Sequence, residues 1–66
     1  MTYTICERNT ALQSGGWHGT YDTLEAAQAR IEAQLPRLRS FVELFVCEGT
    51  PKSPGKKVGP VMRGAT

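Results

Sequence analysis

The chain has 66 residues, a net charge of +2 and an apolar fraction of 39%. This length makes one small domain, whose core stabilises the folded state by only a few kcal/mol. No apolar run approaches the roughly 20 residues that span a bilayer, and no residues are spaced for catalysis. We therefore expect a cytoplasmic domain that is not an enzyme and that works by binding another molecule.

Charge is distributed unevenly along the chain. Residues 1–50 contain four arginines against six acidic residues, a net charge of −2, whereas residues 51–66 contain three lysines and one arginine with no acid, a net charge of +4. The basic segment is also rich in Pro and Gly, which favours an extended or flexible conformation. We therefore expect a domain over 1–50 and a basic C-terminal tail over 51–66, in which Val58–Met62 could dock as a short edge strand.

The N-terminal third predicts a β-hairpin. Thr2–Arg8 is rich in β-branched and aromatic residues and predicts a first strand. Asn9 and then Gly15-Gly16 indicate a turn, after which Trp17–Tyr21 predicts a second, antiparallel strand. Gly19 marks a bulge or a close backbone approach in that strand. We expect Trp17 and Tyr21 to pin the hairpin to the following helix, and stacking on a ligand is the alternative.

The segment Asp22-Thr23-Leu24-Glu25 has the pattern of a capping box, with Asp22 as the N-cap residue. Pro36 cannot continue a helix, so we expect the helix to end near Leu35. Apolar residues recur through this segment at helical spacing and predict one buried stripe: Leu24, Ala27, Ile31, Leu35 and Leu38.

Phe41–Cys47 predicts the strongest strand of the chain. Val42, Leu44 and Val46 alternate on one side, which should be the core side under the helix, whereas Phe41, Glu43, Phe45 and Cys47 point the other way. The order β-β-α-β predicts a small α+β fold: an antiparallel sheet with one helix on one face and a possible short final strand.

The side chains with reactive chemistry are Cys6, Cys47 and His18. They lack metal-ligand spacing, so we expect no metal and no cofactor. His18 has no recognisable acid–base partner. We expect two small buried or half-buried thiols, and the alternative of a disulfide stays open if their strands are adjacent.

A sheet covered by one helix leaves its second face open, and exposed apolar patches mark interfaces. Phe41 and Phe45 lie four residues apart on that predicted face, so a protein partner or a second copy of the chain could dock there. Glu43 and Glu48 could imitate nucleic-acid phosphates. The partner-binding candidates are therefore Phe41, Glu43, Phe45 and Glu48. The alternative partner is nucleic acid, held through phosphate contacts by Lys52, Lys56, Lys57 and Arg63.

The segment Trp17–Ala27 places an aromatic residue, a turn and an alanine-rich helix in succession. In this segment alone, the chain resembles the strand-to-helix junction of small phage and prophage proteins. The resemblance implies a non-catalytic, stoichiometric inhibitor of the anti-CRISPR type, which would block a bacterial defence or regulatory complex by covering its surface in the host cytoplasm.

Overall fold

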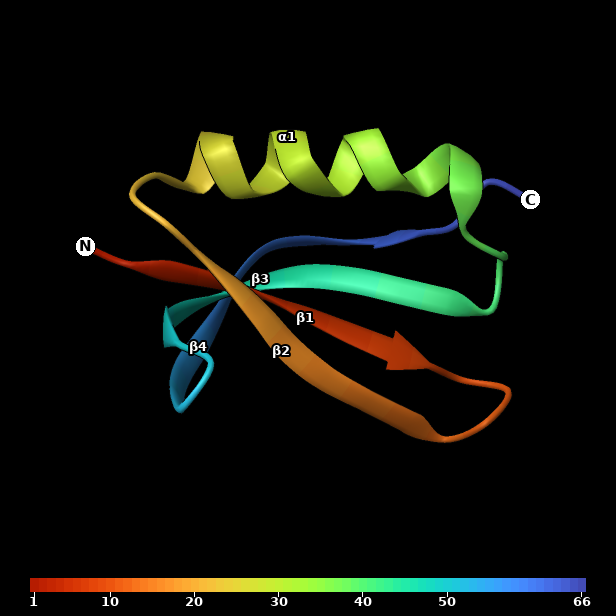
Figure 1. Ribbon diagram of the computed structural model, residues 1–66, viewed down its shortest axis with the longest axis horizontal. Coiled ribbons are helices and arrows are strands. Elements are labelled where there is room, and N and C mark those ends of the chain that lie inside the picture. The colour runs from red at the N-terminus through yellow and green to blue at the C-terminus, as the bar shows by residue number, and fades with distance from the viewer.

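The computed structural model describes residues 1–66. A hairpin, a helical crossover and a second hairpin form one four-stranded antiparallel sheet in the order β2-β1-β3-β4, with the helix on one face (Figure 1). This arrangement confirms the predicted small α+β fold. The elements are β1 (Tyr3–Asn9), β2 (Ser14–Tyr21), α1 (Leu24–Gln34), the 3-10 turn η1 (Leu35–Arg37), β3 (Val42–Thr50) and β4 (Ser53–Arg63).

The core lies between α1 and one face of the sheet. Ile5 pairs with Val46 across β1 and β3, so these two side chains share a face with Leu44. Ala27 and Ile31 project from α1 into the same cluster, and all five residues are at most 1% exposed. The predicted core side of the third strand and the predicted helical stripe are therefore both confirmed.

The start of α1 differs from the expected capping box. Thr23 is the N-cap residue, and its hydroxyl oxygen accepts a hydrogen bond from the Ala26 backbone nitrogen at 3.1 Å. Asp22 was the wrong choice because Thr23 is the residue that has the extended backbone of an N-cap and whose side chain reaches a first-turn nitrogen. The helix ends at Gln34, and Pro36 lies inside η1. No helix of the structure has the length and apolar character needed to cross a bilayer.

The first hairpin is longer than predicted. Gly15 and Gly16 belong to β2 and pair with Arg8 and Glu7, so the turn occupies residues 10–13 instead. The register shifts between the Tyr3–Tyr21 and Ile5–His18 pairs, which indicates a bulge, and Gly19 has a φ of 79° there.

The bulge separates two aromatic residues that we expected to act together. Tyr21 packs against the core cluster, whereas Trp17 pairs with Cys6 on the opposite face of the sheet. In a regular strand residues four apart share a face, but the extra residue reverses the alternation. The expectation that Trp17 pins the hairpin to the helix is therefore wrong.

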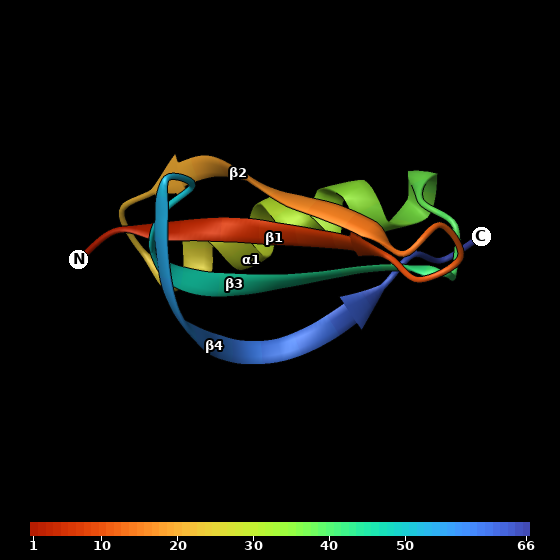
Figure 2. The ribbon, with the colours of Figure 1, turned by 90° about the horizontal axis from the view of Figure 1, so that it is seen from below.

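The segment expected to be a separate tail is part of the sheet. β4 pairs with β3 along most of its length (Figure 2), and Val58 and Met62 pack against the core. The chain end is also held, because the Ala65 and Thr66 nitrogens donate to the Leu35 and Leu38 carbonyls at 2.9 and 3.0 Å. The boundary expected at residue 50 is therefore wrong. Buried apolar residues and ladder hydrogen bonds outweigh the Pro and Gly content, which an edge strand tolerates.

Candidate functional site on the open sheet face

No helix covers the sheet face opposite α1, and Figure 2 looks onto it with α1 behind and with the β3–β4 hairpin crossing in front of β1 at one end. We call it the open face. Paired residues of adjacent strands share a face, so the register identifies its members. They are Trp17 of β2, then Thr4, Cys6 and Arg8 of β1, then Glu43, Phe45 and Cys47 of β3, and finally Lys57 and Arg63 of β4.

Several side chains of the open face are buried although no helix covers them. Cys6 is 7% exposed and Cys47 is 5% exposed. Beside them, the Arg8 guanidinium carbon and the Lys57 Nζ each lie 5.8 Å from the centre of the Phe45 ring. Long cationic side chains thus lie across the face, with their apolar stems on its surface and their charges over an aromatic ring.

Glu43 is held by cations on both sides. Its Oε1 accepts hydrogen bonds from Arg8 Nη2 at 2.6 Å and Nε at 3.0 Å, and its Oε2 accepts one from Arg63 Nε at 3.2 Å. The hydrogen bonds from Arg8 are the main cause of the lowered pKa of Glu43, and Arg63 lowers it further. Glu43 is therefore ionised at neutral pH, and both carboxylate oxygens are occupied.

The two thiols lie on the open face but are not joined. Cys6 and Cys47 are both free and buried, as predicted. Burial raises the pKa of Cys6, and the neighbouring Cys47 raises it further. A thiol with a raised pKa stays protonated at neutral pH, so Cys6 lacks the thiolate character of a nucleophile or metal ligand.

Trp17 is the most exposed aromatic residue of the sheet. Its side chain is 47% exposed and borders a shallow cavity of ≈ 640 Å³ between β1, β2 and the turn that joins them. The cavity combines an indole ring with a guanidinium and several neutral polar groups. Its polar side chains are those of Arg8, Asn9, Thr10, Gln13 and Ser14.

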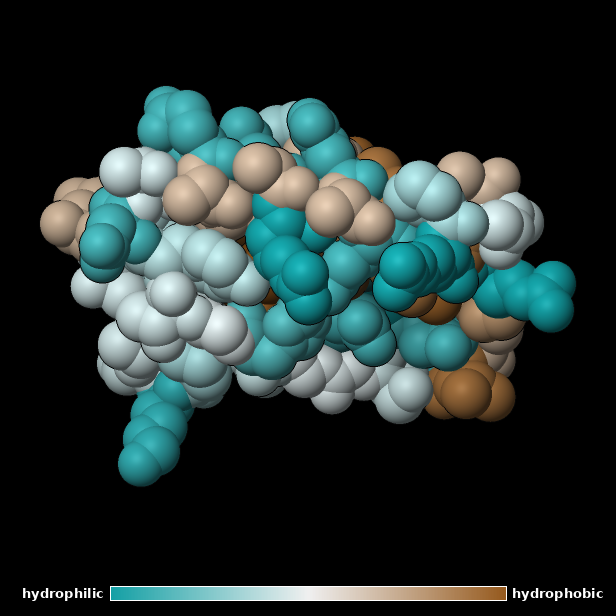
Figure 3. Space-filling model, turned by 45° about the horizontal axis from the view of Figure 1, so that its top comes forward, coloured by the Kyte–Doolittle hydropathy of each residue, from teal (hydrophilic) through white to brown (hydrophobic).

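Charge is segregated between the two sides of the molecule. Glu43 is the one acidic residue of the open face, where it meets Arg8, Lys57 and Arg63. The other acids lie on the side of the helix or of the sheet beneath it, and Figure 3 shows that this side is predominantly hydrophilic. The open face therefore combines a positive charge with an exposed aromatic ring.

The four predicted partner-binding residues do not form one surface. Glu43 and Phe45 are neighbours on the open face, whereas Glu48 pairs with Tyr3 on the face beneath α1. Phe41 lies one residue before β3 and is 41% exposed. Because Glu43 is neutralised by two arginines and Glu48 faces the other way, the sheet presents no free pair of carboxylates.

The alternative, basic set is divided differently. Lys57 and Arg63 lie on the open face beside the aromatic residues. Lys52 occupies the turn between β3 and β4, and Lys56 lies where the register of these strands shifts. The sheet therefore brings half of the basic set to the face that carries Trp17.

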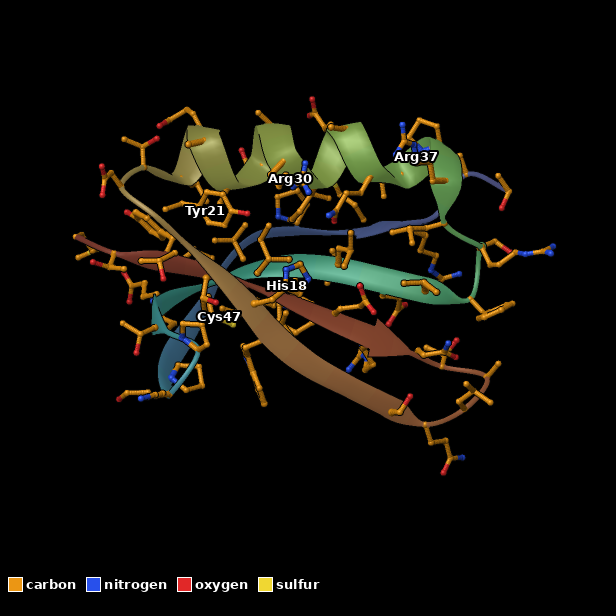
Figure 4. The ribbon with its side chains drawn as sticks, in the orientation of Figure 1. His18, Tyr21, Arg30, Arg37 and Cys47 are labelled. Atoms are coloured by element: carbon orange, nitrogen blue, oxygen red, sulfur yellow. The ribbon has the colours of Figure 1, made fainter.

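A second depression, of ≈ 370 Å³, lies at the C-terminal end of α1, where Arg30, Arg37 and Glu7 line it. Figure 4 shows His18 and Tyr21 on the helix-facing side of the sheet, with Arg30 extending from α1 toward them. His18 Nε2 lies 3.8 Å from Glu7 Oε1. No group of three His, Cys, Asp or Glu side chains is placed to hold a metal ion.

The predicted site residues did not include Arg8, and they did not include Trp17, for which stacking on a ligand was only the alternative. The signal was present in Gly19, because a bulge at that position moves Trp17 to the open face. No protein-family model, curated protein or solved structure matches this chain. The site is therefore interpreted from its own geometry and charge.

Proposed function

We propose that this domain binds single-stranded nucleic acid across its open face. In this proposal Trp17 stacks on a base, while Arg8, Lys57 and Arg63 lie close to the phosphates. The observation that carries the proposal is the position of Trp17: the most exposed aromatic side chain of the molecule lies on the face where cations outnumber acids by three to one. Aromatic rings on a positively charged surface are a recurrent means of binding single strands without reading their sequence.

The stacking energy and the width of the sheet indicate a short site of low affinity. Stacking of one base on an aromatic side chain contributes about 1–3 kcal/mol. Phe45 adds little stacking, because Arg8 and Lys57 already lie over its ring. The distance across the sheet from β2 to β4 is about 14 Å, from three strand spacings of about 4.8 Å. We therefore expect weak binding of a few nucleotides, with strong dependence on salt.

The inhibitor function implied by the resemblance has less support from the geometry. An apolar docking patch requires exposed hydrophobic area, yet Phe45 lies under two cations and both thiols are buried. Imitation of nucleic acid requires free carboxylates, and Glu43 is fully engaged by arginines. Surface occlusion of a protein complex is the second candidate, and the same experiment separates it from the first.

Trp17 allows a direct test because it is the only tryptophan in the chain. Titration with 12-nucleotide oligo(dT) and oligo(U) should quench its fluorescence. Each phosphate contact with a single strand contributes about −0.7 to the slope of the logarithm of the binding constant against log[salt]. Three cations in contact with phosphates should therefore give a slope of about −2. Trp17→Ala, followed by the anisotropy of labelled oligonucleotide, should weaken binding roughly 5- to 150-fold, as expected from the loss of one stacked base.

A matched pair of variants gives the control. Lys57→Gln removes a cation from the open face, whereas Lys52→Gln removes one from the β3–β4 turn. Binding should weaken in the first variant by severalfold more than in the second. Absence of quenching at about 50 mM salt, or equal effects of the two lysine variants, would reject this function and leave a protein partner as the remaining candidate.

A further inference from the structure

The two outer edges of the sheet differ in how well they are protected against pairing with another strand. β4 carries Pro54, Pro60, Lys56 and Lys57, and its register against β3 shifts twice. Proline, lysine and bulges are the devices that discourage edge-to-edge association. β2 contains no proline and no charged Asp, Glu, Lys or Arg residue, and its one bulge, at Gly19, lies beyond Gly15 and Trp17. The β2 edge is therefore left open to pairing.

The hydrogen-bond pattern shows which backbone groups of β2 are free. The Thr10 nitrogen donates to the Phe41 carbonyl, and the Gly49 nitrogen donates to the Thr2 carbonyl. Even-numbered residues around β1 therefore bond toward β3, and odd-numbered residues bond toward β2. The odd residues Ile5 and Glu7 pair with His18 and Gly16. The intervening residues of β2, Gly15 and Trp17, thus direct their N–H and C=O groups away from the sheet.

We propose that the β2 edge pairs antiparallel with the β2 edge of a second copy, giving a twofold-symmetric, eight-stranded sheet. A second copy fits because the same outward groups of Gly15 and Trp17 are offered by both chains, as an isologous interface requires. The strand contains no Asp, Glu, Lys or Arg residue, so two copies meet there without repulsion between such side chains. Association through the open faces would instead bring Arg8, Lys57 and Arg63 of two chains together.

The dimer would also complete the surface around Trp17. In one copy Trp17 lies on the outermost strand, at the margin of the open face. Antiparallel pairing about a twofold axis perpendicular to the sheet keeps both open faces on the same side. The two Trp17 side chains would then lie near the axis, with a cavity beside each. This inference goes beyond the proposed function, because the pairing of β2 does not depend on any nucleic acid.

Two measurements without nucleic acid test the dimer. Sedimentation equilibrium over a concentration series should show a species of twice the 7.2 kDa monomer mass. Amide hydrogen exchange should show that the Gly15 and Trp17 amides become protected as dimer forms, whereas the Gly16 and His18 amides are protected at every concentration. The exchange measurement identifies the edge that pairs, which mass alone cannot do.

A backbone change then tests the contact directly. Methylation of the Trp17 backbone nitrogen, in chemically synthesised protein, removes an outward donor and keeps the indole. Because the twofold axis removes two hydrogen bonds at once, the dimer should weaken at least about tenfold. Gly16→Lys offers a second route, since a side chain at Gly16 meets no atom within 4 Å, and it should weaken the dimer more than Gly16→Ala does.

Three results would overturn the inference. The first is a chain that stays monomeric at about millimolar concentration, where even weak specific association is detectable. The second is a dimer whose Gly15 and Trp17 amides exchange as fast as in the monomer. The third is a dimer unaffected by both the methylated nitrogen and Gly16→Lys. Nucleic-acid binding by a monomer would leave the proposed function intact, and a β2-paired dimer without such binding would reject only that function.

Discussion

The two faces of the sheet bury their side chains by different means. Beneath α1, Ile5, Leu44 and Val46 are at most 1% exposed because a helix lies over them. On the open face, Cys6 and Glu43 are each 7% exposed although no helix lies over them. There the neighbours are long side chains from the same sheet: Arg8 and Arg63 bind Glu43, and Arg8 and Lys57 lie over the Phe45 ring.

Because of this difference, the residues that stabilise the fold are not the residues that are available to bind a ligand. Apolar burial under a helix is insensitive to salt and is lost only when the fold is lost. Contacts between exposed cations, an aromatic ring and a carboxylate are weaker, and salt screens them. We therefore expect the helix-covered face to hold the fold together, and the side chains of the open face to be able to rearrange around a ligand.

The largest expected effect is on the covered face. Leu44→Ala removes a fully buried side chain at the centre of the core cluster and should destabilise the fold by about 2–5 kcal/mol. Since a domain of this size has only a few kcal/mol of stability, the variant should be largely unfolded at 25 °C by circular dichroism. If urea unfolding shows a decrease in the free energy of unfolding below about 1 kcal/mol, α1 does not exclude water from this face as the structure indicates.

The matching change on the open face should be smaller. Phe45→Ala removes a half-buried ring that two cations cover. Full burial of such a side chain contributes about 1.5–3 kcal/mol, so we expect a loss of about 1–2 kcal/mol here. The variant should unfold in one transition at lower urea concentration. A loss equal to that of Leu44→Ala would show that the open face is a second core rather than a covered surface.

The covered face could be predicted from the sequence because its signals are periodic. The alternation at Val42, Leu44 and Val46 and the helical spacing of Ala27 and Ile31 both indicated which side is buried. The second hairpin was harder to predict, because the Pro- and Gly-rich composition of residues 51–66 is compatible with both a flexible tail and an edge strand. Only pairing with β3 distinguishes the two.

The candidate site could not be predicted for a different reason. One bulge reverses the direction of every side chain before it in the strand. Gly19 indicates that a bulge can form there, but whether it forms depends on the pairing of β2 with β1. Arg8 looked like an ordinary charged residue at a strand end. Its contacts with Glu43 and Phe45 span 35 and 37 positions of sequence and exist only once β1 and β3 are adjacent.

A smaller effect should appear as pH dependence of the open face. The pKa of Glu43 is lowered in the folded state from an ordinary value of 4.5. The stability that Glu43 contributes is therefore fully present above pH 4.5 and is lost as the pH falls through the lower, folded-state pKa. Glu43→Gln imitates the protonated form, so its Tm should lie below that of the unmodified protein at pH 7, with the difference disappearing toward about pH 2.

Glu32→Gln provides the control for this comparison. Glu32 lies on the exposed side of α1 and makes no ion pair, so its replacement should change the Tm little at any pH. Addition of about 1 M salt should narrow the difference between Glu43→Gln and the unmodified protein at pH 7. A constant difference from pH 7 to about pH 2 would show that the carboxylate charge of Glu43 does not stabilise the open face.

The smallest effect concerns the two thiols, whose cover on the open face differs. Cys6 pairs with Trp17 and Phe45, whereas Cys47 pairs with Thr4 and Lys57. Burial and a raised pKa should slow iodoacetamide alkylation of Cys6 at pH 7.5 at least about tenfold relative to the denatured chain. Trp17→Ala should then accelerate alkylation of Cys6 and leave Cys47 nearly unchanged, as mass spectrometry of the labelled peptides would show. If alkylation of both thiols accelerates together, global unfolding rather than local cover by the Trp17 side chain controls their reactivity.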